Sequence, residues 1–127
     1  MTLRPGPASR LTIYLHADAQ WHHRAVPDEI IRRALLAGLS GASLFHGIEG
    51  YGRSGILHSD IDPDIMNSLP CEVVIVDMSE ERLRGFLPEL DEILDHGIAV
   101  IDTVEVAQVR RPGPAITGPS TSSPLDP

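Results

Sequence analysis

Residues 71–77 have the sequence CEVVIVD, in which residues 73–76 are all apolar. Successive side chains of a strand point to opposite faces of its sheet. Val73 and Ile75 therefore belong to one face, and Val74 and Val76 belong to the other. A strand with two apolar faces is typical of a sheet that is covered on both sides. The rest of the chain predicts only two helices, enough for one face, so we expect a second copy of the chain to cover the other.

Three further segments have the character of strands. Residues 10–16 alternate apolar and polar side chains, and residues 42–48 form a second candidate strand. A last strand begins with the apolar run IAVI at residues 98–101. We expect it to bend near Asp102 and to continue through Val109.

Two stretches between these strands have helical periodicity. Pro27 is well placed as the first residue of one helix, and Gly38 is a natural C-terminal cap. Asp77 and Glu80 have the spacing of a capping box, which predicts Asp77 as the N-terminal cap of the second helix. Pro88 lies inside the apolar stripe of that helix and predicts a kink or a fresh turn.

The resulting order, β-α-β-β-α-β, predicts an α+β fold. It is that of the ferredoxin-like sandwich, in which an antiparallel four-stranded sheet carries both helices on one face. We assign this domain to residues 10–111. Residues 1–9 are expected to form a flexible N-terminal segment, and the Pro/Ser-rich residues 112–127 a disordered tail.

The composition limits the classes of function. The chain has 127 residues, enough for one domain with a buried core. Its formal net charge of −8 disfavours nucleic acid as a partner. The one cysteine, Cys71, predicts a buried small side chain and indicates the reducing cytoplasm. The chain has no apolar run of membrane-spanning length, so we expect no direct insertion into a membrane.

The connection between the second and third strands is much longer than a hairpin needs. It opens with residues 47–55, GIEGYGRSG, in which four of nine residues are glycine. Glycine allows a backbone to approach a ligand closely. Arg53 in this stretch has a guanidinium that can bind an anion through two hydrogen bonds. The alternative, an ordinary flexible hairpin tip, fits the spacing equally well.

Other polar residues give weaker signals. Trp21 is either a packing anchor or a platform on which a base could stack. His22 and His23 are adjacent, and adjacent side chains of a strand or helix point apart, so we predict no metal site there. The sequence has no nucleophile elbow and no phosphate-binding P-loop, so we predict no catalytic residues and no enzyme.

The chain resembles the PII-like family catalogued as domain of unknown function 190, and the resemblance covers roughly residues 10–109. The stretch at residues 50–53 is similar to the segment that opens the T-loop of PII signalling proteins. Five motifs in the family's order carry the resemblance: Trp21-His22, residues 47–52, Leu57-His58-Ser59, Leu69-Pro70-Cys71-Glu72-Val73 and residues 86–90.

The resemblance implies a homotrimer that binds a small anionic metabolite, such as an adenine nucleotide, in clefts between its subunits. The T-loop-like segment, residues 51–68, would then signal to a protein or membrane-transporter partner. The residues implied as ligand-binding are Gly50, Tyr51, Gly52, Arg53, Arg110 and Arg111. No cofactor is implied.

The chain departs from the PII pattern in two places. PII proteins have a glycine-rich phosphate loop between the second helix and the last strand, where this chain has only His96 and Gly97. The family's Trp-His-Gly is Trp-His-His here, so His23 stands at the glycine position. We therefore predict a PII-like sensor. The alternatives are a small ferredoxin-like oligomeric enzyme, or a metal-binding protein of the divalent-cation-tolerance type.

Overall fold

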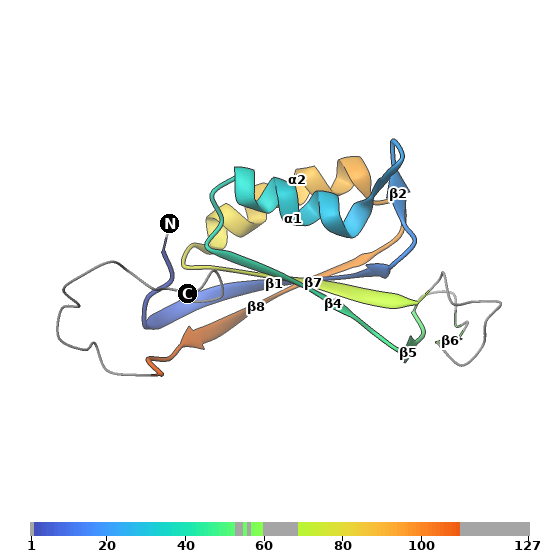
Figure 1. Cartoon of the computed structure of the whole chain (residues 1–127). Helices are drawn as coiled ribbons and strands as arrows, with labels where there is room; N and C mark the ends of the chain where they lie inside the picture. Colours follow the sequence, from blue (N-terminus) through green and yellow to red (C-terminus); the bar gives the residue numbers. More distant parts are fainter. Residues whose placement is uncertain (1, 53–54, 56, 60–68, 110–127) are drawn as a thin grey trace, which may run out of the picture.

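The protein has two layers, with a twisted four-stranded sheet below and two helices packed on one of its faces (Figure 1). The computed structural model describes residues 2–52, 55, 57–59 and 69–109. The predicted α+β, ferredoxin-like fold class is confirmed. No helix among the described residues is long and apolar enough to cross a bilayer.

Four strands form the main sheet in the order β4-β7-β1-β8, and all three neighbouring pairs are antiparallel. Their bounds are β1 (Gly6–His16), β4 (Gly41–His46), β7 (Pro70–Asp77) and β8 (Ile98–Val106). β1 begins four residues before the predicted start, because Gly6 to Ser9 pair with the end of β8.

The last strand differs from its prediction. β8 runs through Asp102 without a break in its pairing and ends at Val106 rather than Val109. Asp102 lies opposite Arg10 of β1, whose Nε and Nη2 donate to its two carboxylate oxygens at 3.1 and 2.6 Å. This ion pair crosses the two strands at the point where the bend was expected.

The first helix follows the sequence prediction closely. α1 (Val26–Leu36) has Pro27 in its first turn, where a missing N–H costs no hydrogen bond. Its C-terminal cap is Ala37, and Gly38 follows with a φ of +74°, a conformation that glycine adopts without strain.

The second helix corrects the predicted N-terminal cap. α2 (Glu80–Ile93) is capped by Ser79, not by Asp77, and the Ser79 hydroxyl accepts a hydrogen bond from the Arg82 N–H. Asp77 is the last residue of β7, and its buried carboxylate instead accepts from the Ser79 N–H and from Ser40. Pro88 lies within α2, which remains a single helix.

The core lies between the helices and the face of the sheet that they cover. Alternate residues of β1 and β7 point into it, and α1 and α2 contribute its other side. Its most deeply buried apolar side chains are Leu11, Ile13, Val26, Ile30, Val73, Ile75 and Leu83.

No element among the described residues covers the other face of the sheet, called here the open face (Figure 1). Tyr14, Phe45, Ile98 and Val100 point to it from three different strands and are 46%, 53%, 43% and 44% exposed. The structure therefore agrees with the prediction that one chain covers only one side of its sheet.

Two short hairpins were not predicted. β2 (Gln20–Trp21) pairs with β3 (Arg24–Ala25) just before α1. β5 (Glu49–Gly50) pairs with β6 (His58–Ser59) and closes the base of the long connection.

Candidate functional site

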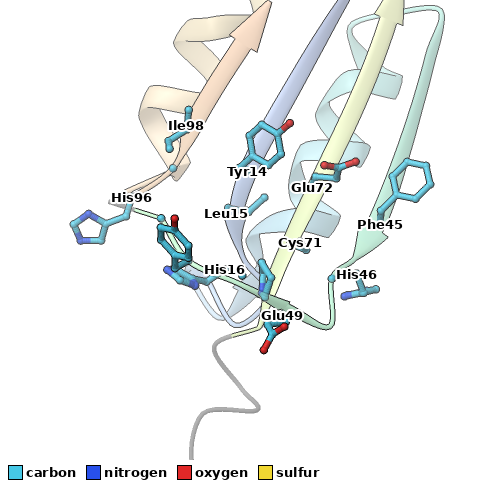
Figure 2. A pocket seen from close by; sticks show the side chains of 16 residues that line it. Tyr14, Leu15, His16, Phe45, His46, Glu49, Cys71, Glu72, His96 and Ile98 are labelled. Atoms are coloured by element: carbon cyan, nitrogen blue, oxygen red, sulfur yellow. The ribbon is translucent and has the colours of Figure 1, made fainter. Parts of the chain in front are cut away.

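A cavity of about 980 Å³ lies at one end of the sheet, where β1 and β4 end and β7 and β8 begin (Figure 2). Its wall combines aromatic rings, imidazoles, carboxylates and the glycine-rich start of the long connection. The lining residues are Tyr14, Leu15, His16, Phe45, His46, Gly47, Glu49, Gly50, Tyr51, Gly52, Pro70, Cys71, Glu72, His96, Gly97 and Ile98.

Strand register brings four of these residues into one row across the open face. Glu72 of β7 lies opposite Phe45 of β4 on one side and opposite Tyr14 of β1 on the other. Tyr14 in turn lies opposite Ile98 of β8. Directly opposite residues have Cβ atoms about 5 Å apart, so the carboxylate of Glu72 stands between two aromatic side chains.

The base of the long connection is held against β7 by a close backbone approach. The Gly47 N–H donates to the Pro70 carbonyl oxygen at 2.8 Å. A Cβ at Gly47 would lie 2.9 Å from Pro70 Cγ and 3.1 Å from that same oxygen, so a side chain here would force Pro70 or the loop base to shift. A Cβ at Gly52, by contrast, would meet nothing within 4 Å.

The predicted site residues divide into two groups. Gly50, Tyr51 and Gly52 all line the cavity, and Tyr51 is 75% exposed. The other three, Arg53, Arg110 and Arg111, lie outside the described residues. The structure thus brings half of the predicted site to one cavity and leaves the arginines as predictions.

The described part of the cavity wall has two carboxylates and three imidazoles. It carries the carboxylates of Glu49 and Glu72, and none of its described residues is an arginine or lysine. Cys71 also lines the cavity, and burial, with a smaller contribution from the charge of Asp28, raises the pKa of its thiol to about 11. The thiol therefore stays protonated near neutral pH and is a poor nucleophile.

Sequence reasoning missed the row of Phe45, Glu72 and Tyr14. Alternation in residues 10–16 placed Tyr14 on the face opposite Leu15, but no local pattern shows which residues of other strands lie beside it. The three residues come together only because β7 pairs with β1 on one side and with β4 on the other, each in a fixed register.

A second polar cluster lies on the helix side of the molecule. Glu29, whose side chain is 1% exposed, accepts hydrogen bonds from Arg32, Arg33 and Arg24. These bonds, from Arg32 and then Arg33 above all, hold the pKa of the Glu29 carboxyl far below its usual range. Arg33 also donates to Glu92 of α2 at 3.0 Å. The cluster joins the two helices and the β2-β3 hairpin.

Trp21 belongs to this second cluster. Its ring packs against the core, and the guanidinium carbon of Arg33 lies 4.9 Å from the ring centroid, within range of a cation–π interaction. The turn that follows has positive φ at both central residues, +49° at His22 and +65° at His23. Trp21 lines no part of the cavity, which favours its role as a packing anchor.

The described residues contain no group of three or more His, Cys, Asp or Glu side chains placed to hold a metal ion. His16, His46 and His96 all line the cavity but do not form such a group.

Comparison with known proteins shows the family to which the chain belongs. The model of DUF190, described as "Uncharacterized ACR, COG1993", matches residues 8–106. A UPF0166 protein of Aquifex aeolicus is 30% identical over 96 residues, which span 76% of this chain and 90% of that protein.

Solved structures share the fold. A PII-like protein of Thermus thermophilus superposes with a TM-score of 0.57 at 19% identity, covering 82% of this chain and 93% of that one. CPII, a nitrogen regulatory PII-like protein of Thiomonas intermedia K12 bound to ADP, AMP and bicarbonate, gives 0.50 at 18% identity over 83% and 92%. The divalent ion tolerance protein CutA1 of Ehrlichia chaffeensis gives 0.50 at 15% identity over 83% and 86%.

Proposed function

The chain belongs to the DUF190 family and has the fold of PII-like proteins, and from this premise we propose that it is a PII-like sensor of a small anionic metabolite. An adenine nucleotide is the class of ligand that we propose. It would bind in clefts between the subunits of a homotrimer in the cytoplasm, and no catalytic step is part of the proposal.

The observation that carries the proposal is the cavity beside the base of the long connection. Its volume of about 980 Å³ is at the upper end of the range typical of small-molecule sites. Gly50, Tyr51 and Gly52 belong both to its wall and to the start of the T-loop-like segment. A ligand in the cavity would therefore touch the segment that is proposed to signal.

The exposed residues of the open face support an assembly of several chains. Tyr14, Phe45 and Ile98 line the cavity and are about half exposed in a single chain. A second copy packed on the open face would cover these side chains and would add its own surface to the cavity. We propose the homotrimer on this ground and on the resemblance to PII proteins.

The choice of adenine nucleotide rests on the fold neighbours. CPII of Thiomonas intermedia K12, which shares this fold, has been solved with ADP, AMP and bicarbonate. We propose that Arg53, Arg110 and Arg111 supply the positive charge for the phosphates, because the described wall of the cavity has no arginine or lysine.

Ligand binding would change the conformation of residues 51–68 and so alter their affinity for a partner. An order-disorder change of a loop is an established way to convert a bound phosphate into a signal. The partner would be a protein, such as a membrane transporter.

Calorimetric titration of the full chain with ADP, AMP, ATP, cyclic AMP and bicarbonate tests the proposal. We expect at least one adenine nucleotide to bind at micromolar concentration, and Arg53→Ala to weaken its binding about tenfold or more. Arg84→Ala is the matched control, since Arg84 lies on α2 and pairs with Glu80 on the outer surface. Absence of binding by every nucleotide in the series would refute the proposed function.

A further inference from the structure

Resting on the proposed function, we propose that ligand binding in the cavity is coupled to proton uptake by three imidazoles, those of His16, His46 and His96. An imidazole that carries a proton would attract the anionic ligand, and the bound ligand would stabilise that proton in return. The site would bind its ligand more tightly as the pH falls. The sensor would therefore respond to pH as well as to the concentration of the metabolite.

The three imidazoles come from three separate parts of the fold. His16 is the last residue of β1, His46 is the last residue of β4, and His96 lies in the turn between α2 and β8. All three line the cavity, and Figure 2 shows them spread along the end of the sheet. Three of the six histidines of the chain therefore belong to one site.

The charge of the described cavity wall near neutral pH depends on these imidazoles. The other titratable residues that line it are Tyr14, Glu49, Tyr51, Cys71 and Glu72. Phenol groups ordinarily titrate well above neutral pH. The thiol stays protonated there as well, because burial raises the pKa of Cys71 to about 11. The two carboxylates oppose an anionic ligand, and protonation of any two imidazoles is enough to cancel their charge.

Imidazole is the side-chain group whose charge ordinarily changes between about pH 5 and 8. A negative charge beside an imidazole raises its pKa, because it stabilises the protonated form. A cube with the volume of this cavity has an edge of about 10 Å, close to the screening length of about 8 Å at physiological salt. A phosphate group in the cavity would therefore interact with the charge of at least one of the three rings.

A second copy of the chain on the open face would preserve this coupling. The proposed ligand lies between the subunits, so the imidazoles that line the cavity would face it in the assembly too. Exclusion of water by the second copy would lower the local dielectric constant and strengthen the attraction between imidazolium and phosphate. The coupling requires the imidazoles to face the ligand, and it does not require them to be exposed to solvent.

Linkage gives the sign of the pH dependence. The affinity should be highest where the imidazoles are already protonated in the empty cavity. It should fall with rising pH until they are neutral even in the complex. Between these two limits, each ligand that binds takes up a fraction of a proton from the buffer.

Calorimetric titration of the full chain with ADP at about pH 7, in PIPES and in Tris buffer, tests the proposal, because the difference in heat between the buffers measures proton uptake. The terminal phosphate of ADP titrates in this range too, so the quantity to compare is the difference between protein variants. We expect at least one of His16→Asn, His46→Asn and His96→Asn to lower the uptake by about 0.2 proton per ligand or more.

His22→Asn is the matched control, since it also removes an imidazole but lies in the β2-β3 turn, outside the cavity. Asparagine tolerates the positive φ of this position. This variant should take up as many protons as the unmodified protein.

A measurement on the unmodified protein makes the test independent of how the variants fold. Histidine ring signals in NMR, followed against pH with and without ADP, should show the titration midpoint of at least one cavity imidazole about 0.5 pH unit or more higher in the complex. Unchanged midpoints for all three, or the same proton uptake by all three variants and the unmodified protein, would overturn the inference and leave the proposed function standing. Absence of nucleotide binding would overturn both.

Discussion

The two faces of the sheet differ in how completely a single chain covers them. On the helix-covered face, Ile13, Val73 and Ile75 have no exposed surface and belong to the core that the helices and the sheet form together. On the open face, Tyr14 and Phe45 remain about half exposed. Tyr14 lies on the same strand as Ile13, and Phe45 lies on β4, which pairs with the strand of Val73 and Ile75. The difference shows that one chain covers only one side of its sheet and leaves aromatic side chains exposed on the other.

The largest effect should come from the covered face. Ile75→Ala removes a fully buried side chain and should lower the free energy of unfolding by about 2–5 kcal/mol, measured by urea denaturation. Val76→Ala, its neighbour on the open face, should cost less than about 1.5 kcal/mol when unfolding is measured at a protein concentration low enough to dissociate the proposed trimer. Equal losses would mean that the open face is covered in solution as fully as the helix-covered face.

An acidic residue on the open face should prevent assembly. Val100→Asp places a charge on a surface that the proposed trimer buries, and we expect association to weaken at least about a hundredfold. Sedimentation equilibrium should then report the mass of one chain, 13.8 kDa, with an unchanged circular dichroism spectrum. Thr103→Asp, on the same strand but pointing to the other face, should assemble normally. A monomeric unmodified protein would contradict the expectation at once.

A smaller contrast separates two glycines at the base of the long connection. Gly47→Ala forces a Cβ against Pro70 and should lower the free energy of unfolding by about 1–3 kcal/mol. Gly52→Ala meets no atom within 4 Å and should change it by less than about 1 kcal/mol. Thermal or urea unfolding of the two variants measures the difference, and equal losses would show that Pro70 moves aside.

The smallest effect is expected in the β2-β3 hairpin. His23 has a φ of +65°, which costs a residue with a Cβ about 1–2 kcal/mol, while glycine adds about 0.5–1 kcal/mol of unfolded-state entropy. His23→Gly should therefore raise the free energy of unfolding by about 0.5–1 kcal/mol in urea titration. Asp18→Gly, in the preceding turn where no positive φ occurs, should give no gain.

Much of the fold could be predicted from local patterns. Pro27 and Gly38 mark the ends of α1, and the strand at residues 71–77 is observed over Pro70–Asp77. The predicted capping residue of α2 was wrong. Asp77 and Ser79 are both good caps, and only tertiary contacts decide between them. The Asp77 carboxylate accepts a hydrogen bond from the hydroxyl of Ser40, a residue far away in the sequence.

The candidate site was predictable only in part. Glycine spacing marked the loop base, and Gly50 and Gly52 do line the cavity. Glu72 and Tyr14 had no such signal, because they are far apart in the chain and their proximity depends on how β1 pairs with β7. The hairpin at His22 and His23 was missed because His-His is not one of the pairs, such as Asn-Gly or Asp-Gly, that mark a two-residue hairpin turn in a sequence.

The Asp77 carboxylate has a consequence for how motion is distributed along β7. It binds the backbone N–H groups of Ser40 and Ser79 at 3.0 Å each, at the end of β7 that is farthest from the cavity. The strand is eight residues long, so about 25 Å separate this anchor from the loop base. Amide hydrogen exchange at Ser40 and Ser79 should be equally slow with and without nucleotide, whereas the amide of Gly47, which already donates to the Pro70 carbonyl oxygen, should exchange more slowly still when the cavity is filled.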